Sequence, residues 1–170
     1  MVLRASFLLA LLWVFKVPTL GSPQTESPIK WSARVASPHP FYRAGDKLTV
    51  VLKAAIEPGW HVYSFPQPAG SPVMPTMILV PNGQTFVQEG KIERQKPDSA
   101  MDPNLGVQTE FYENSAAFRI PLRVELKSHP GRRKLTLQVR YQACNDRLCL
   151  PPKTETVETL VEIREEPVQK

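Results

Sequence analysis

The chain has 170 residues, of which 42% are hydrophobic and 22% are charged, with two cysteines and a formal net charge of +5. This length and composition are typical of one globular domain that buries its own core, so the fold does not need the cysteines to hold it together. The basic residues are spread along the chain apart from a short cluster at 132–134, which excludes the concentrated basic surface of a nucleic-acid-binding protein.

The first predicted element is an export signal. Arg4 provides a positive charge, and the apolar run from Ala5 to Phe15 stops at Lys16. The run is shorter than the roughly 20 residues that span a bilayer, and small residues follow it, as in a secretory signal peptide. We expect cleavage near Gly21 and no stable membrane insertion afterwards, with an uncleaved membrane anchor as the alternative.

The rest of the chain is predicted to form one domain between two short flexible ends. Residues 22–29 have the composition of a flexible leader, residues 30–164 form the domain, and residues 165–170 are a frayed tail. No stretch has the period and length of an amphipathic helix, and eighteen prolines also argue against helices.

Hydrophobic and polar residues alternate along the domain, which indicates half-buried β-strands. The alternation is clearest in residues 118–127 and 135–141, and it predicts that Leu126 shares the buried face of its strand. Pro121 lies on the polar face and lacks an N–H donor, which predicts an edge or a bulge there. Further strands are predicted at residues 30–36, 47–57, 60–64, 76–80, 85–89 and 156–163.

The number and spacing of these strands predict an all-β domain. For one domain of this size, the leading architecture is an immunoglobulin-like β-sandwich. Residues 90–110 are the longest stretch without alternation, and a loop of that length inside a compact domain is usually functional or disordered.

The two cysteines, Cys144 and Cys149, stand close together just after a predicted strand. Closing a loop of about six residues stabilises a fold by only roughly 2 kcal/mol, against about 4.7 for a hundred-residue loop. Three interpretations remain from the residues: a reversible redox pair, an inert structural bridge, and half of a metal site. Spacing and compartment favour the inert bridge, because most disulfides in exported proteins are structural. Metal is least favoured, because His39, His61 and His129 lie on scattered segments.

A resemblance to a known family changes this balance. The segment Tyr141–Val157, which contains both cysteines, resembles the active-site hairpin of the N-terminal periplasmic domain of the thiol:disulfide interchange protein DsbD. Pro58–Ser64, Thr109–Ser115 and Phe118–Val124 resemble further stretches of that family, in the same order and at matching separations. Together these stretches cover roughly residues 30–163.

The resemblance implies an immunoglobulin-like thiol–disulfide oxidoreductase in the periplasm, with no metal and no cofactor beyond its cysteine pair. Cys149 corresponds to the sulfur attacked in mixed disulfides, and Cys144 corresponds to the resolving partner. The implied partners are thioredoxin-like proteins, including those of cytochrome c maturation, and a membrane electron importer. This chain stops after the sandwich, so we expect those partners on separate chains and expect the domain to be a monomer.

The resemblance also assigns residues that support the site. Phe111 corresponds to the cap-loop aromatic that covers the disulfide until a partner displaces it, and Tyr112 corresponds to a support for that loop. Glu110 matches an acidic residue near the cysteines, and Tyr63 and His61 fall where the family has tyrosines facing the site. From residue types alone, ordinary core packing is the alternative for the two cap-loop aromatics and for the histidine.

Two features of the sequence depart from the family. Thr109 stands where the best-known members carry the first of two adjacent acids, and the cysteines are one residue closer together. The competing hypothesis is a non-enzymatic exported β-sandwich that binds partners while the disulfide only pins a hairpin. A reduction potential separates the two functions, because structural disulfides lie below about −300 mV.

Overall fold

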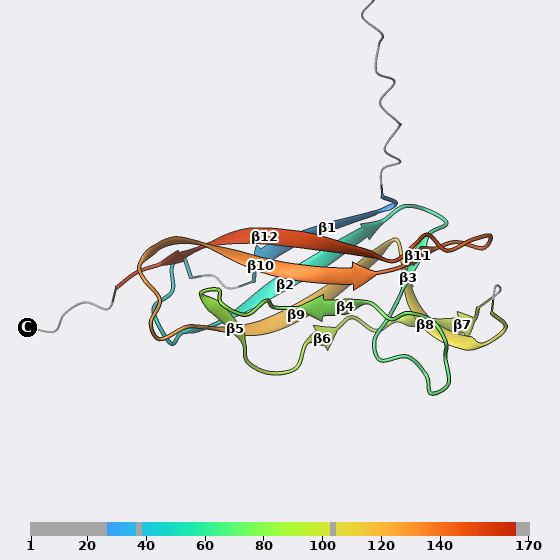
Figure 1. Ribbon diagram of the computed structural model, residues 1–170, viewed down its shortest axis with the longest axis horizontal. Helices are drawn as coiled ribbons and strands as arrows, with labels where there is room; N and C mark the ends of the chain where they lie inside the picture. The colour runs from blue at the N-terminus through green and yellow to red at the C-terminus, as the bar shows by residue number, and fades with distance from the viewer. Residues whose placement is uncertain (1–26, 37–38, 103–104, 166–170) are drawn as a thin grey trace, which may run out of the picture.

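The computed structural model describes residues 27–36, 39–102 and 105–165 (Figure 1). The predicted signal peptide, most of the leader and the end of the tail lie outside these ranges. No helix in the described ranges is long and apolar enough to cross a membrane. The strands are β1 (Ile29–Val35), β2 (Lys47–Ile56), β3 (His61–Tyr63), β4 (Met77–Leu79), β5 (Phe86–Gln88), β6 (Glu93–Arg94), β7 (Asp98–Met101), β8 (Gln108–Glu113), β9 (Ser115–Val124), β10 (Gly131–Tyr141), β11 (Ala143–Cys144) and β12 (Lys153–Ile163).

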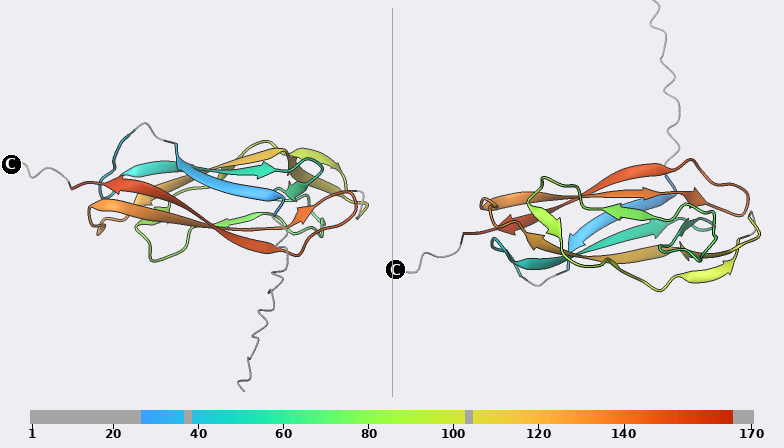
Figure 2. Two further views of the ribbon diagram at one scale, coloured as in Figure 1. Left: turned by 90° about the horizontal axis from the view of Figure 1, so that it is seen from above. Right: turned by 60° about the horizontal axis from the view of Figure 1, so that its bottom comes forward.

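These strands form three antiparallel sheets, which confirms the predicted all-β fold. Sheet A has the order β1-β2-β9-β5, with β6 also paired to β9, and sheet B has the order β12-β10-β4. Both sheets contribute to one hydrophobic core and lie face to face as a sandwich (Figure 2). Sheet C, with the order β11-β3-β8-β7, lies at the end of the sandwich farthest from the C-terminus (Figure 1).

The core follows from the alternation in the sequence. The inward residues of β9 and β10 are all buried, and the Phe118 ring lies at the centre of an aromatic group. Its centroid is 5.5 Å from that of Phe65 and 5.6 Å from that of Tyr112. The prediction for Leu126 is wrong: β9 ends at Val124, and the Leu126 side chain is 72% exposed in the turn that follows.

Pro121 lies opposite an interruption in the neighbouring strand. β9 is an interior strand, but β5 pairs with its residues 122–124 and β6 with residues 118–119, and the chain leaves the ladder between them. Gly90 lies in this gap with a φ of +120°, and a Cβ there would be 3.2 Å from the Pro121 ring. Pro121 has no N–H to donate, and it lies at a position where neither β5 nor β6 pairs with β9. A sheet tolerates proline at such a position.

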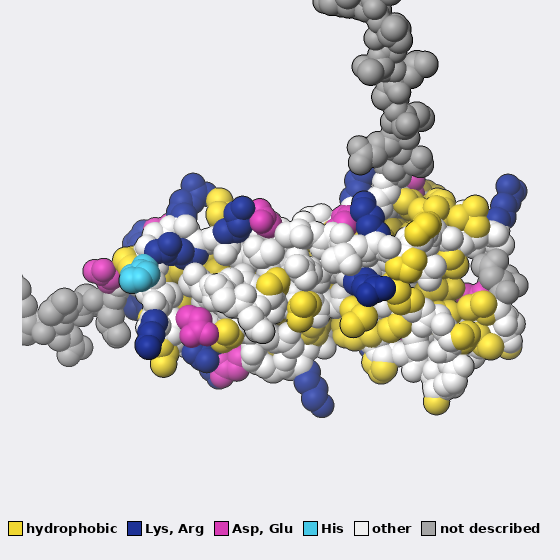
Figure 3. Space-filling view, in the orientation of Figure 1, with side chains coloured by type: hydrophobic (Ala, Val, Ile, Leu, Met, Phe, Trp, Pro, Cys, Tyr) yellow, Lys and Arg dark blue, Asp and Glu magenta, His cyan; other side chains and the backbone are white. Residues whose placement is uncertain are grey.

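Two strands of sheet C are continuous in the chain with strands of the sandwich. β8 continues into β9 through Asn114, whose φ of +59° turns the chain, and β10 continues into β11 through Gln142. The expected long loop at residues 90–110 instead contains β6, β7 and the start of β8. All four residues of β7 are exposed, so this strand has no alternation to reveal it. Hydrophobic side chains gather on the surface at this end of the molecule (Figure 3).

We predict that Phe118→Ala lowers the free energy of unfolding by about 3–5 kcal/mol, because it leaves a cavity among the core aromatics. Leu126→Ala, just beyond the end of the same strand, serves as the matched control and should change stability by less than about 0.5 kcal/mol. Urea unfolding followed by circular dichroism measures both. Equal losses for the two variants would contradict the assignment of the core.

Candidate functional site

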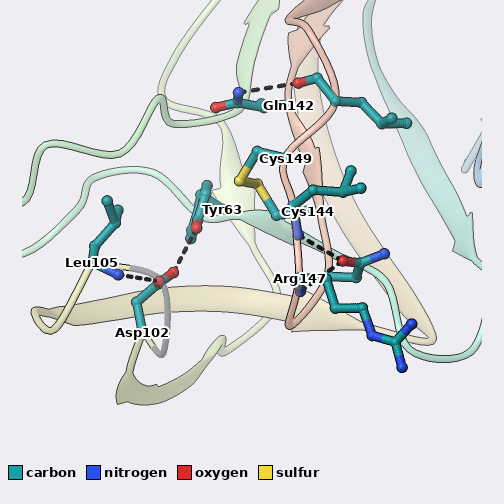
Figure 4. The surroundings of a disulfide bond; sticks show 10 residues. Tyr63, Asp102, Leu105, Gln142, Cys144, Arg147 and Cys149 are labelled. Carbon is teal, nitrogen blue, oxygen red and sulfur yellow. Dashed lines mark hydrogen bonds between the residues drawn. A yellow bond between two sulfur atoms is a disulfide. The ribbon is translucent and has the colours of Figure 1, made fainter.

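The candidate site is the disulfide between Cys144, at the end of β11, and Cys149, which are five residues apart (Figure 4). The Asn145 side chain shapes the loop between them, because its Oδ1 accepts hydrogen bonds from the backbone N–H groups of Arg147 and Leu148, each at 2.9 Å. The residues that flank the two cysteines are also joined through the backbone: the N–H of residue 150 donates a 2.8 Å hydrogen bond to the carbonyl of residue 143. The hairpin therefore has several supports besides its sulfur–sulfur bond.

The two cysteines differ in exposure. Cys144 is 0% exposed, whereas Cys149 is exposed on the outer arm of the hairpin. Thiol–disulfide exchange requires an attacking thiolate to reach one sulfur of the pair. A partner approaching from solvent therefore has access to Cys149 rather than to Cys144.

The buried sulfur lies in a small apolar cluster separate from the main core. Cys144 packs with Tyr63 and Val73, and Phe111 packs against this group. Phe111 lies within β8, where it is the register partner of Tyr63 on β3 and of Asp98 on β7. The predicted cap aromatic is thus near the buried cysteine, but it is held in a paired strand rather than in a loop.

The register of sheet C places His61 beside the buried cysteine. His61 is the direct partner of Cys144 across the β3–β11 ladder, and it is the partner of Glu113 across the β3–β8 ladder. His61 is 7% exposed, and its ring centroid lies 5.2 Å from that of Tyr63 and 5.4 Å from that of Phe111. Both site residues on β3, His61 and Tyr63, therefore lie on the face of sheet C that carries Cys144.

Burial controls the protonation of this histidine. It holds the pKa of His61 below its ordinary value, because the charged imidazolium is poorly solvated there. The negative charges of Asp102, Glu113 and Asp146 act in the opposite direction without reversing the shift. His61 is consequently neutral near pH 7 and able to accept a proton.

A buried carboxylate that the sequence did not point to belongs to the same site. Asp102 is 4% exposed, and its Oδ2 accepts a hydrogen bond of 2.5 Å from the Tyr63 hydroxyl (Figure 4). Its Oδ1 accepts a second hydrogen bond, at 3.0 Å, from the backbone N–H of Leu105. Burial and this carboxylate together raise the pKa of Tyr63, so the phenol stays protonated. No motif or alternation in residues 90–110 marks Asp102 in advance.

Glu110 and Tyr112 lie on the opposite face of β8 from Phe111, because side chains alternate along a strand. Glu110 forms an ion pair with Arg94 of β6 at 2.9 Å. The Tyr112 hydroxyl donates a 2.8 Å hydrogen bond to the carbonyl of Gln95, and the ring packs edge-on against the main core. The structure therefore groups His61, Tyr63, Phe111 and both cysteines, and it places Glu110 and Tyr112 behind them.

The described residues hold no group of three or more histidine, cysteine, aspartate or glutamate side chains arranged to bind a metal ion. Exposed hydrophobic side chains occur on the cysteine hairpin and around the end of β7. Leu148 directly precedes Cys149, and Met101 and Leu105 lie at the end of β7 and just beyond it, on either side of the undescribed residues 103–104.

Two solved structures are similar to the chain. The N-terminal domain of Neisseria meningitidis DsbD in its reduced form is 17% identical, with a TM-score of 0.45 over 66% of this chain and 77% of that chain. The N-terminal periplasmic domain of ScsB from Proteus mirabilis is 15% identical, with a TM-score of 0.53 over 82% of this chain. This chain spans only 48% of that ScsB chain. The comparison with curated protein sequences finds no match.

The family model described as "Thiol:disulfide interchange protein DsbD, N-terminal" matches residues 32–161. This match covers well over half of the chain and includes both cysteines and each strand of sheet C. The likeness to the ScsB domain supports the same fold. The chain therefore belongs to the family of DsbD N-terminal domains.

Proposed function

We propose that this chain is an exported periplasmic domain that relays electrons to or from thioredoxin-like proteins through a reversible Cys144–Cys149 disulfide. The observation that carries the proposal is the pairing of one exposed cysteine with one buried cysteine at the end of the sandwich. Family membership supports thioredoxin-like redox partners. The apolar run near the N-terminus, with its charged flanks, supports export.

The reaction is a pair of thiol–disulfide exchanges that needs no cofactor. In the oxidised domain, a partner thiolate attacks the sulfur of Cys149, the Cys144–Cys149 bond breaks, and its electron pair leaves on the sulfur of Cys144, which takes a proton. A second thiolate of the partner then attacks the partner sulfur that is bonded to Cys149. The bond to Cys149 breaks, and the electron pair leaves on the sulfur of Cys149. The domain leaves with two thiols and the partner with a disulfide. Electrons pass on to an acceptor disulfide by the same steps in reverse.

The surroundings of the disulfide suit both protection and docking. Phe111 packs against the cluster that contains Cys144, and we propose that it shields the pair from small oxidants. Glu110 and Tyr112 support it indirectly, because their contacts with Arg94 and Gln95 fix the far face of β8. Exposed side chains near Cys149, including Leu148, offer a thioredoxin-like partner an apolar surface to cover.

We predict that Cys144→Ala traps mixed disulfides through Cys149, because the resolving thiol is then absent. Incubation with a thioredoxin-like protein, followed by non-reducing electrophoresis and mass spectrometry, should show a thiol-sensitive adduct on Cys149. Cys149→Ala is the matched control and should trap far less, because its remaining thiol is buried. Equal trapping by both variants, or none by either, would contradict the proposed roles.

We predict that the reduction potential of the pair lies above about −300 mV, in the range of exchanging rather than structural disulfides. Equilibration with glutathione redox buffers, followed by alkylation of free thiols and mass spectrometry, measures it. A disulfide that stays closed across all such buffers would favour the competing hypothesis of a binding module with a pinned hairpin.

We predict that Phe111→Ala speeds oxidation of the reduced pair by oxidised glutathione several-fold, because the substitution uncovers the cluster around Cys144. Phe41→Ala removes a comparable ring near the C-terminal end of the domain, where it stacks on Arg164, and should leave the rate unchanged. Rapid acid quenching and thiol counting follow the reaction. An unchanged rate for the Phe111 variant would assign that ring to packing alone.

A further inference from the structure

The buried cysteine has a close neighbour that can accept a proton at neutral pH. His61 and Cys144 are direct partners in the antiparallel β3–β11 ladder, and both are buried. Direct partners on one face of such a ladder have Cβ atoms about 4.5–5.5 Å apart, so their side chains lie next to each other. Tyr63, which contacts the His61 ring, belongs to the same cluster as Cys144.

A buried thiol resolves a mixed disulfide only after it loses its proton, and burial opposes the formation of a thiolate. At 0% exposure, Cys144 has poor access to hydroxide or buffer. The proton therefore needs a protein acceptor within the cluster. Tyr63 cannot serve, because its phenol is protonated and already donates to Asp102.

We propose that His61 accepts the proton of the Cys144 thiol when Cys144 resolves a mixed disulfide on Cys149. This inference rests on the proposed function and adds to it the residue that moves the proton. The imidazole is placed for this task by its ladder position opposite Cys144 and by its packing between the Tyr63 and Phe111 rings.

The step balances in protons and electrons. The Cys144 thiol gives its proton to the imidazole and becomes a thiolate. The thiolate attacks the sulfur of Cys149, the bond from Cys149 to the partner breaks, and the electron pair leaves on the partner's sulfur. That sulfur takes a proton from solvent, and the imidazolium later returns its own proton to solvent. In the opposite direction, His61 first takes a proton from solvent, and the imidazolium then protonates Cys144 as it leaves.

The charges of the described residues that act on His61 are negative, which favours this role. Asp102 follows β7, Glu113 lies opposite on β8, and Asp146 lies in the cysteine hairpin. Each stabilises the imidazolium that forms beside the thiolate. The hairpin's cation, Arg147, points away from the disulfide (Figure 4). The site thus keeps the histidine neutral at rest through burial and supports its charge during the reaction.

The reaction of the reduced protein with one equivalent of the chromogenic aryl disulfide dithiobis-nitrobenzoate isolates this step. Attack by exposed Cys149 releases the first nitrothiobenzoate, and attack by Cys144 on the resulting mixed disulfide releases the second. We expect the rate of the second release in the unmodified protein to be nearly constant between about pH 6.5 and 8, above the pKa of His61. In His61→Gln it should rise about tenfold per pH unit, and at about pH 6.5 it should be at least about tenfold slower than in the unmodified protein.

His129→Gln, the same substitution at an exposed loop histidine, is the matched control and should keep the profile of the unmodified protein. The first release should change by less than about twofold in both variants. Parallel pH profiles for His61→Gln and the unmodified protein would overturn the role of His61 while leaving the redox function intact. Failure of the unmodified protein to give a second release would instead reject the proposed function, and the inference with it.

A second measurement uses the unmodified protein and does not depend on folding of the variant. Nuclear magnetic resonance follows the His61 ring through a pH titration in the oxidised and the reduced protein. We expect the reduced protein alone to show a second titration step at the ring, because the Cys144 thiol then titrates beside it. Identical curves in the two redox states would overturn the proposal.

Discussion

The antiparallel ladder that joins β3 to β11 on one side and to β8 on the other determines the environment of the buried sulfur. Side chains alternate along each strand, so a slip of one residue would turn His61 and Tyr63 away from Cys144. The register is set from outside the site, because β8 and β11 are continuations of β9 and β10, whose core faces cannot slip without exposing apolar residues. The sandwich therefore positions the chemistry at its end through strand register.

The difference in exposure between the two cysteines determines which sulfur an incoming thiolate can attack and which sulfur leaves in the proposed exchange. In that exchange, nucleophiles from solvent attack Cys149, and the sulfur that leaves is that of Cys144, which packs with Tyr63, Val73 and Phe111. A leaving thiolate in such an environment needs a nearby source of protons, which ties redox chemistry to proton movement within one cluster. Asp102 contributes to the electrostatics of this cluster in two ways. It holds the Tyr63 hydroxyl and places a negative charge near the histidine.

The sequence predicted the parts of this arrangement that depend on local patterns. Eight predicted segments each overlap a strand, and the longest of them alternate because they bury one face against the sandwich. β7 was missed because it is exposed throughout, and Leu126 was misplaced because the alternation runs past the end of β9. The resemblance pointed to His61 and Phe111, but the position of Glu110 behind the site depends on β8, which alternation did not reveal. Asp102 reaches Tyr63 across 39 residues of sequence, a distance that no local pattern encodes.

Several hydrogen bonds that hold the cysteine hairpin are made by groups other than the two sulfurs. Those within the loop are made by Asn145, and those at its base by residues 142, 143 and 150. Opening the disulfide leaves each of these bonds available, so the two thiols stay facing each other at a high effective concentration. Closure of the ring then requires little loss of conformational freedom. Rapid closure of this kind would limit how long a partner protein stays covalently attached.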